Sequence, residues 1–491
     1  MKKMLSRSFK KVLTILACTA VLLSSGCGTS ASPKFDPKEP VTINIWHYYN
    51  GPQESAFNLL VTDFNETIGA KKGIFVEAVS QGNVGQLIST VLEAAQNKVG
   101  SAKLPTIFAA YADNAFDMDK MGLVANLDEY MTKEELARYN PDYLEEGRFD
   151  KDGSLKIFPI AKSTELMLLN KTDWDKFASA TGADIASLST MEGVAATAKA
   201  YYEWSDALTP TAGDGKAFFG RDSMANYMLI GSQQLGDELF SVTDGKASAT
   251  INSASMRKLW DNFYIPYING YFTSYGRFRS DDIKTGDIIA MVGSTSGVAY
   301  FPSQVIDADN RSYDIEMLAL PAPRFAGSEP YAVQQGAGMV VTKSDPKTEL
   351  AAVTFLKWFT EKEQNVKFAL LSGYLPVTVD GITTKSLDAF LAAEKDEKIS
   401  PKLVNSLPVS FDICQTHTMY TGKPFNGGTQ VRDVLEKSMI SQAKRDRELL
   451  LKSTSDSAIY NDLLAKYSSD AHFDEWLSAF EAQINDIITI P

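Results

Sequence analysis

The chain has 491 residues, of which 44% are hydrophobic and 22% are charged, a composition typical of globular proteins that build more than one core. Its formal net charge is −13, and no run of Lys and Arg follows the N-terminus, which argues against a nucleic-acid surface. The chain has only three His and three Cys residues, and Cys414 and His417 are their only close pair outside the N-terminus. A metal centre is therefore not expected.

The N-terminus predicts an export signal. Residues 1–11 carry five positive charges and no acid, and residues 12–23 form an apolar run that is followed by the small residues of "SSG". This run is too short for a comfortable transmembrane helix, but it suits the apolar region of a signal peptide. Removal of residues 1–26 would take away those five positive charges, so the net charge of −13 would become −18.

The end of this signal, Ser24-Ser25-Gly26-Cys27, resembles a bacterial lipobox. The lipobox pattern prefers Leu three residues before the cysteine, where this chain has Ser24. The resemblance implies that Cys27 is acylated and becomes the mature N-terminus, and two acyl chains give stable anchoring. Residues 27–40 would then form a flexible tether between membrane and folded domain. The alternative is an ordinary secretory signal with an incidental cysteine.

From residue 41 onward, strand-like and helix-like patterns alternate. Strands are predicted at 41–46, 73–79 and 105–111, and amphipathic helices at 53–66 and 84–96. This succession favours an α/β fold with a largely parallel sheet and helices on its faces. Later segments continue the pattern: an Ala-rich helix at 190–205, a buried strand with a small-residue turn within 287–301, a strand and long helix within 336–377, and a mostly helical tail.

Aromatic and polar side chains follow two of the predicted strands at the point where each strand ends. Strict alternation along a strand cannot direct four consecutive rings into one core, so at least two rings near residue 46 should point elsewhere. Ligands on such sheets bind beyond the carboxyl ends of the strands. We therefore expect one crevice to collect Trp46, His47, Tyr48, Tyr49 and Asn50 with Tyr111, Asp113 and Asn114.

The order of several segments resembles the extracellular solute-binding proteins of family 1, the carbohydrate-type, maltose-binding-protein-like subunits of ABC importers. These segments are "VTINIWHYYNG", "LPTIFAAYADNA", "LKIFPIAKSTELMLLNKTDW", "IIAMVGSTSG" and the run from "GAGMVVTKSDP" to "SGYLPV". They extend over nearly the whole mature chain. Each segment alone is weakly specific, but their order behind a lipobox is typical of the family.

The resemblance implies a two-lobed periplasmic-binding-protein-like fold, with discontinuous lobes joined by a hinge. Lobe 1 would comprise residues 41–160 plus 336–375, and lobe 2 residues 165–330 plus 378–491. The chain would cross between the lobes at Pro159–Thr164, Ala332–Gly336 and Gly373–Val377, segments with the Gly, Pro and small polar residues common at hinges and turns. The ligand cleft would lie between the lobes.

The same resemblance implies further residues that face this cleft. A sugar presents polar edges and apolar C–H faces, so its site should combine aromatic rings with hydrogen-bonding groups. The rings would be Trp46, Tyr48, Tyr49 and Tyr111; a place in the core is an equal alternative for Trp46. By family position, the added polar candidates are Lys162, Ser163 and Thr164 at the first crossing, Ser223 and Asn226 at a helix start, Ser294, Thr295 and Ser296 in the lobe 2 turn, and Gln334 and Gln335, with Tyr374 at the third crossing.

The resemblance implies a lipid-anchored, non-catalytic subunit without cofactor, on the outer face of the bacterial cytoplasmic membrane. It would be a monomer that captures a sugar or oligosaccharide and delivers it to ABC permease subunits. A phosphorylated polyol such as a glycerol phosphate is the alternative ligand, because Lys162, Arg221, Arg277 and Arg279 could bind an anion. A secreted glycosidase is a further alternative. The stretch "GSTSG" at 293–297 lacks the central Ser of a nucleophile elbow.

Overall fold

The computed structural model describes residues 33–307, 310–393, 399–454 and 456–489. The predicted signal at 1–26 and the predicted lipid site at Cys27 lie outside the described residues. Of the predicted tether at 27–40, the described end contacts the fold. Phe35 packs against the hydrophobic core of the first lobe, and Asp36 forms an isolated β-bridge with Glu39. The tether is therefore attached to the first lobe before residue 41.

The first lobe is built on a four-stranded sheet of order β13-β3-β1-β2. Strand β1 pairs in parallel with β2 and β3, and β13 adds an antiparallel edge. Ile43 and Ile45 of β1 are fully buried, whereas their neighbours Thr42 and Asn44 are exposed, which is the expected alternation. The strands are β1 (Val41–His47), β2 (Ile74–Ser80), β3 (Ile107–Ala110) and β13 (Gly338–Val341).

Helices cover this sheet at the predicted places. Helix α2 turns Phe57, Leu60 and Phe64 inward, at the spacing of an amphipathic helix. Helix α4 starts at a capping box in which Asn83 and Gln86 satisfy each other's backbone N–H. The helical elements are α2 (Gly51–Phe64), η1 (Asn65–Gly69), α3 (Ala70–Lys72), α4 (Val84–Ala95), α5 (Ala112–Lys120), η2 (Leu127–Glu129), α6 (Lys133–Leu136), α7 (Pro141–Glu145), α13 (Pro346–Phe359) and α14 (Lys362–Ser372).

The second lobe has its own four-stranded sheet, of order β11-β4-β8-β5. Only β5 and β8 pair in parallel; β4 is antiparallel to both neighbours. The largely parallel character predicted from residues 41–111 therefore holds for the first sheet but not for the second. Strand β4 is buried along its whole length. The strands are β4 (Glu165–Asn170), β5 (Phe219–Arg221), β8 (Ala290–Ser294) and β11 (Met317–Pro321).

Helices and hairpins cover one face of the second sheet with a core around Trp260 and Tyr264. Leu166 and Leu168 of β4, on the other face, belong to the same hydrophobic cluster as the first lobe. The helical elements are α8 (Lys171–Thr181), η3 (Ile185–Ser189), α9 (Met191–Asp206), α10 (Met224–Gln234), α11 (Ser253–Ile268), α12 (Arg279–Thr285) and η4 (Thr295–Tyr300). The short strands are β6 (Phe240–Thr243), β7 (Lys246–Ala249), β9 (Gln304–Ile306), β10 (Ser312–Asp314), β12 (Tyr331–Val333) and β14 (Thr418–Tyr420).

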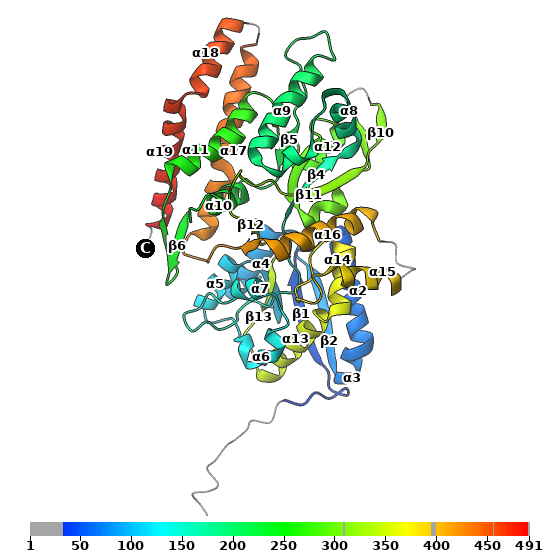
Figure 1. The fold of residues 1–491 in the computed structure, drawn as a ribbon. Coiled ribbons are helices and arrows are strands. Elements are labelled where there is room, and N and C mark those ends of the chain that lie inside the picture. Colours follow the sequence, from blue (N-terminus) through cyan, green and yellow to red (C-terminus); the bar gives the residue numbers. More distant parts are fainter. Residues whose placement is uncertain (1–32, 308–309, 394–398, 455, 490–491) are drawn as a thin grey trace, which may run out of the picture.

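The C-terminal region divides between two environments. Helix α15 (Thr384–Ala393) packs on α14 of the first lobe, and α16 (Pro401–Thr416) packs on β11 of the second. This placement differs from the assignment of all of 378–491 to lobe 2. The remaining helices, α17 (Gly428–Lys452), α18 (Ser457–Tyr467) and α19 (Asp470–Ile488), join the core of the second lobe. Figure 1 shows the two lobes one above the other, with α16 and β12 at their junction.

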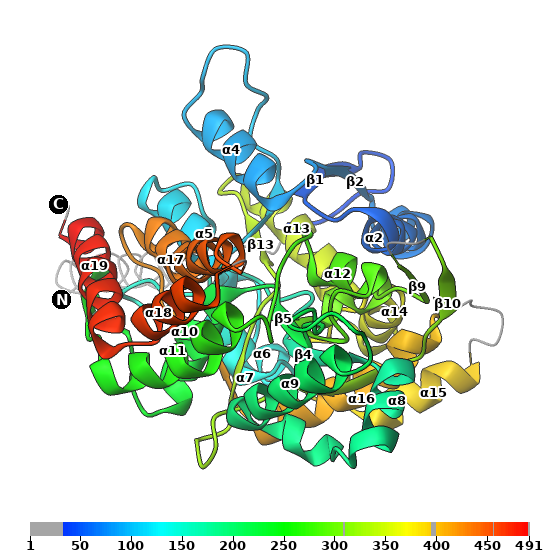
Figure 2. The ribbon, with the colours of Figure 1, turned by 90° about the horizontal axis from the view of Figure 1, so that it is seen from above.

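The three predicted crossing segments lie side by side. Ser163 and Gln335 exchange backbone hydrogen bonds of 2.9 and 2.8 Å, and Lys162 and Leu375 exchange bonds of 3.1 and 2.6 Å. The first segment therefore pairs with both of the others. Seen from above, α17, α18 and α19 lie together at one side of the molecule (Figure 2).

Candidate functional site

Two cavities lie between the lobes. The smaller cavity has a volume of about 440 Å³ and is lined from α5 and α4 on one side and from α10 and α17 on the other. The larger cavity has a volume of about 940 Å³ and is lined by the start of α2, by α12 and by the turn after β8. Gln335, on the second crossing segment, lines both cavities. Both volumes are of the size that small-molecule sites occupy.

The structure brings ten of the predicted residues to these cavities. Those that line the smaller cavity are Tyr111, Asp113, Asn114, Asn226, Gln334 and Gln335. Those that line the larger cavity are Asn50, Ser223, Ser294, Ser296 and again Gln335. Thr164 lies beside them and lines a hollow of about 40 Å³ together with Asn226. The lining thus combines side chains from both lobes and from the crossing segments.

The rings at the end of β1 lie elsewhere. His47 and Tyr49 are fully buried, and Tyr49 packs on Phe57, Phe368 and Tyr374 with ring centroids 5.2–5.7 Å apart. Trp46 is half-buried and packs against the same core. The strand ends at His47, and strand alternation no longer constrains the residues after it. Tyr48 and Tyr49 can therefore both enter the core, contrary to the expected ligand wall.

Tyr48 does not line the smaller cavity but packs against a residue that does. Its ring stacks on Tyr111 with a centroid distance of 6.4 Å. Its hydroxyl accepts a hydrogen bond of 3.3 Å from the backbone N–H of Ala337 and lies 3.3 Å from the hydroxyl of Tyr374. Burial raises the pKa of both Tyr48 and Tyr374 well above the usual value. Both predicted ligand contacts are therefore buried, and Tyr48 instead supports Tyr111, which lines the smaller cavity.

The side chain of Lys162 connects the first crossing segment to the second. Its ammonium group pairs with the Glu146 carboxylate and donates a 3.0 Å hydrogen bond to the carbonyl of Gly336, all of it buried. The amide of Gln334 donates to the same carboxylate at 3.1 Å. Ser163 is buried in the backbone pairing of the crossing segments, and Thr295 is buried at the start of η4. A buried ammonium group that is already paired with a carboxylate is a poor partner for an anionic ligand.

A chain of hydrogen bonds in the second lobe connects Asn226 to the smaller cavity. Asn226 is fully buried, and its amide N–H donates to Glu165 at 2.8 Å while its carbonyl accepts from Arg432 at 2.8 Å. Arg221 holds the other oxygen of Glu165 at 2.6 Å. Asn226 therefore fixes Arg432, which lines the cavity together with Lys423. Ser223 caps α10 and donates to Glu436.

Several polar atoms of the site lack a partner among the described residues. The side-chain carbonyls of Gln334 and Gln335 and the hydroxyls of Thr164 and Thr295 are buried without a hydrogen bond. A buried polar atom left unpaired costs about 1–3 kcal/mol. Both Gln carbonyls belong to residues that line the smaller cavity. They are acceptors for which a ligand hydroxyl would be a suitable donor.

Two carboxyl groups in the cavity walls are unusually basic. Burial raises the pKa of Asp113 to about 6, although Arg432 opposes the shift. Burial also raises the pKa of Asp222 to about 6, partly offset by the backbone N–H of Arg279. Asp113 lies where a side chain on Gly428 would be, 2.6 Å from its ideal Cβ position. This carboxyl group thus meets the first turn of α17 across the cleft.

Among the lining residues that sequence reasoning missed are Glu146, Asp222, Phe278, Asp281, Tyr300 and Arg432. Phe278 and Tyr300 are rings that remain 52% and 46% exposed. Neither follows a predicted strand directly. Arg432 lies in the helical tail, where an isolated basic residue gives no signal.

Among the residues that the structure describes, no group of three or more His, Cys, Asp or Glu side chains is arranged to hold a metal ion. No described helix is long and apolar enough to cross a membrane.

The fold is similar to that of solved binding proteins. The cyclic α-maltosyl-1,6-maltose binding protein of Arthrobacter globiformis matches with a TM-score of 0.66 at 18% identity, over 91% of this chain and 99% of that chain. An ABC substrate-binding protein of Listeria monocytogenes, solved with cycloalternan, matches with 0.63 at 16% identity, over 92% and 100%. UgpB of Mycobacterium tuberculosis, solved with glycerophosphocholine, matches with 0.61 at 16% identity, over 84% and 99%.

At identities this low, the structural matches show a common fold and nothing more. No curated protein matches the chain. The model of the bacterial extracellular solute-binding proteins matches residues 60–389, which is more than half of the sequence and includes the second sheet, all three crossing segments and every strand of the first sheet except β1. The chain belongs to the bacterial extracellular solute-binding protein family.

Proposed function

We propose that the cleft captures an uncharged sugar or oligosaccharide and delivers it to the permease of an ABC importer. The observation that carries this proposal is the pair of unpaired Gln334 and Gln335 carbonyls beside Tyr111 at the point where the lobes join. A hydroxylated ligand donates to such acceptors and presents a C–H face to a ring. Contacts to both lobes would favour the closed state. The structural neighbours solved with oligosaccharides support this ligand class.

A phosphorylated polyol is the second candidate, supported by Arg432 and Lys423 in the smaller cavity and by the neighbour solved with glycerophosphocholine. Of the four basic residues that the sequence offers for binding an anion, three are already paired with a carboxylate. Lys162 pairs with Glu146, Arg221 with Glu165 and Arg279 with Asp282. Arg277 lies over the ring of Phe278. The uncharged ligand therefore fits the charges of the cleft better.

A thermal-unfolding panel tests the ligand class. The purified protein is heated with maltotriose, cycloalternan, mannotriose, ribitol and glycerophosphocholine in separate samples. Binding to the folded state raises the free energy of unfolding, by about 2.7 kcal/mol at a ligand concentration of 100 Kd. We expect one or more of the uncharged compounds to raise the melting temperature. Stabilisation by glycerophosphocholine alone would favour the second candidate, and release of reducing sugar during incubation would indicate a glycosidase instead of a binding protein.

We also propose that the protein is a monomer anchored to the outer face of the cytoplasmic membrane through a lipid on Cys27. The lipobox-like "SSGC" and the family's extracellular location support this proposal. Replacement of Cys27 by Ser removes the acylated sulfur, so the Cys27→Ser variant should appear in the medium of the expressing cells. Unchanged recovery of the variant in the membrane fraction would contradict the anchor.

A further inference from the structure

Two exposed aromatic side chains line the larger cavity, and neither of them directly follows a strand. Phe278 precedes α12 and Tyr300 ends η4, and both line this cavity. Side chains of this size are usually buried in a folded protein. The lining around these rings is mixed: Asn50, Gln53, Ser280, Ser294, Ser303 and Gln304 are polar, and Met291, Pro302 and Ile306 are apolar. Exposed rings among hydrogen-bonding groups suit a ligand with apolar faces and polar edges.

The loop that bears Phe278 is held in place by buried contacts. Arg279 pairs with Asp282, and their side chains are 5% and 2% exposed. The Asp282 carboxylate also accepts the backbone N–H groups of Tyr275 at 3.2 Å and Gly276 at 2.6 Å. The backbone N–H of Arg279 donates to Asp222 at 2.9 Å, at the end of β5. The ring of Phe278 is therefore positioned by the fold before any ligand arrives, which reduces the entropic cost of binding.

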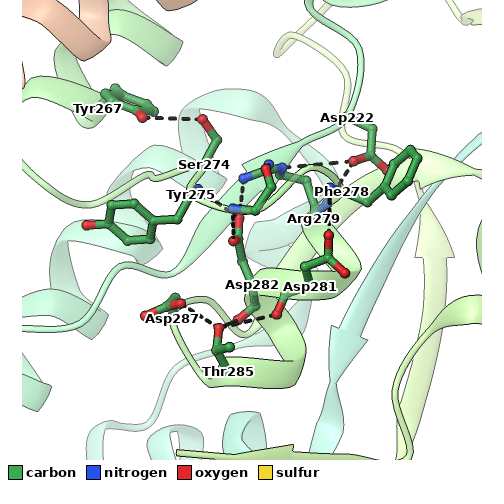
Figure 3. Close-up of polar contacts among 11 residues, drawn as sticks. Asp222, Tyr267, Ser274, Tyr275, Phe278, Arg279, Asp281, Asp282, Thr285 and Asp287 are labelled. Carbon is green, nitrogen blue, oxygen red and sulfur yellow. Dashed lines mark hydrogen bonds and ion pairs between the residues drawn. The ribbon is translucent and has the colours of Figure 1, made fainter. Parts of the chain in front are cut away.

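Figure 3 shows these contacts, with Phe278 and Asp222 at one end of the network and Tyr275 at the other. Tyr275 is 72% exposed and lines a different cavity, of about 730 Å³, on the second lobe. The same loop thus presents one ring to the cleft and one ring away from it. This arrangement provides a matched control.

Carboxylates outnumber cations in the wall of the larger cavity. Glu165, Asp222 and Asp281 line it, with Lys284 as the one basic lining residue. Glu165 is occupied by Arg221 and Asn226. Asp222 uses Oδ1 for Arg279, and Asp281 uses Oδ2 for the backbone N–H of Phe278. The other carboxylate oxygen of Asp222 and of Asp281 accepts no hydrogen bond from any described residue. Each can accept a charge-assisted bond from a ligand hydroxyl.

We propose that Phe278 and Tyr300 form a stacking subsite for one sugar ring of an uncharged glycan, with Asp222 and Asp281 as acceptors for its hydroxyl groups. This inference rests on the proposed function, because it assigns the ligand of the same cleft. The carboxylates repel a phosphate or carboxylate substituent at this position. Arg277, whose guanidinium lies 5.1 Å from the ring centroid of Phe278, offsets part of this repulsion. The subsite therefore favours uncharged over anionic sugars, whereas Arg432 in the smaller cavity attracts an anion.

Titration calorimetry tests the subsite in the full chain, with the uncharged compound of the thermal panel that stabilises the wild type most. We expect Phe278→Ala and Tyr300→Ala each to weaken binding about 10-fold, the loss of one well-packed aromatic contact. Phe278→Tyr should keep the wild-type affinity, because it keeps the flat ring. Tyr275→Ala should change the affinity less than 2-fold. The side chains are exposed, so the melting temperatures without ligand should stay unchanged.

The charge is tested separately with glucuronic acid as an anionic competitor of the same ligand. Asp281→Asn should increase competition by glucuronic acid relative to the wild type, because one repelling charge is gone. Wild-type affinity in both alanine variants would overturn the subsite and leave the proposed function intact. If the wild type binds no uncharged compound of the panel, both the proposed function and the subsite are overturned.

Discussion

Gln335 is the residue at which the two cavities meet. It lies on the second crossing segment, its backbone pairs with Ser163, and its side-chain carbonyl is buried without a partner. Such an unpaired acceptor lowers the stability of the ligand-free protein, and it raises the affinity for a ligand that donates a hydrogen bond to it. One side chain therefore acts on folding and on binding with opposite signs.

The Gln335→Leu substitution separates these two effects. Loss of the unpaired carbonyl should raise the free energy of unfolding of the ligand-free protein or leave it unchanged. Loss of the acceptor should weaken glycan binding by about 1 kcal/mol, the net value of one neutral hydrogen bond. Urea unfolding and calorimetry measure the two quantities. Gln483→Leu, on the exposed face of α19, is the control; equal effects of both variants on binding would contradict the role of Gln335.

His47 makes the stability of the first lobe sensitive to acid. Burial lowers its pKa from 6.5 to about 4. Its Nδ1 accepts the backbone N–H of Tyr49 at 3.2 Å, and its Nε2 has no partner among the described residues. The unfolded chain binds a proton below pH 6.5 and the folded chain only near pH 4. Stability from this residue is therefore complete above pH 6.5 and decreases by up to about 3 kcal/mol as the pH falls to 4.

Comparison with His47→Asn isolates this contribution, since Asn keeps an acceptor near the position of Nδ1. Asp113 and Asp222 act in the opposite direction, because burial raises their folded pKa to about 6, above the ordinary value of 3.8. These two groups titrate equally in both proteins. In urea unfolding at pH 7.0, 5.5 and 4.5, the wild type should lose stability relative to the variant as the pH falls. Parallel curves would show that His47 is protonated equally in both states.

At the scale of elements, the junction depends on close backbone contact. Gly336 has φ of +91°, and its ideal Cβ would lie 2.9 Å from the carbonyl oxygen of Ala161 and 3.1 Å from the Cα of Lys162. Any side chain there must push the first crossing segment away. The pairing of Ser163 with Gln335 depends on this approach.

Gly336→Ala should therefore lower the free energy of unfolding by about 1–3 kcal/mol, the cost of a strained backbone conformation. Gly422→Ala is the matched control, because its Cβ would meet nothing within 4 Å. A shift of the urea midpoint in the first variant and none in the second is the expected result. Equal midpoints would mean that the crossing segments separate without cost.

The periodicity of the sequence predicts β1, β2, α2 and α4 of the first lobe well, because each has one buried face. The predicted strand at 73–79 is β2 (Ile74–Ser80), and the predicted helix at 84–96 is α4 (Val84–Ala95). The rule that ligands bind beyond strand ends led to Tyr111, Asp113 and Asn114. It misplaced His47 and Tyr49, because the core continues past the end of β1. Phe278 was missed because its position depends on the bond between Arg279 and Asp222, a tertiary contact.

At the scale of the whole molecule, contacts across the cleft hold the lobes together in this structure. Beside the smaller cavity, Lys120 donates to the side chain of Asn426 at 2.9 Å and Lys151 pairs with Asp244 at 3.2 Å. Beside the larger cavity, Gln53 donates to the carbonyl of Ser296 at 3.2 Å. The pair of Lys151 and Asp244 is exposed and contributes about 0–1 kcal/mol. Such contacts can break without large cost, so a ligand can decide how far the lobes separate.

Small-angle X-ray scattering during a titration tests the central claim that the lobes enclose an uncharged glycan. The full chain is measured alone, with the most stabilising uncharged compound of the thermal panel, and with glycerophosphocholine, at equal concentrations. We predict that the uncharged compound lowers the radius of gyration in proportion to the bound fraction, while glycerophosphocholine leaves it unchanged. A radius of gyration that stays constant at saturation with the uncharged compound, or that falls with glycerophosphocholine alone, would contradict the account.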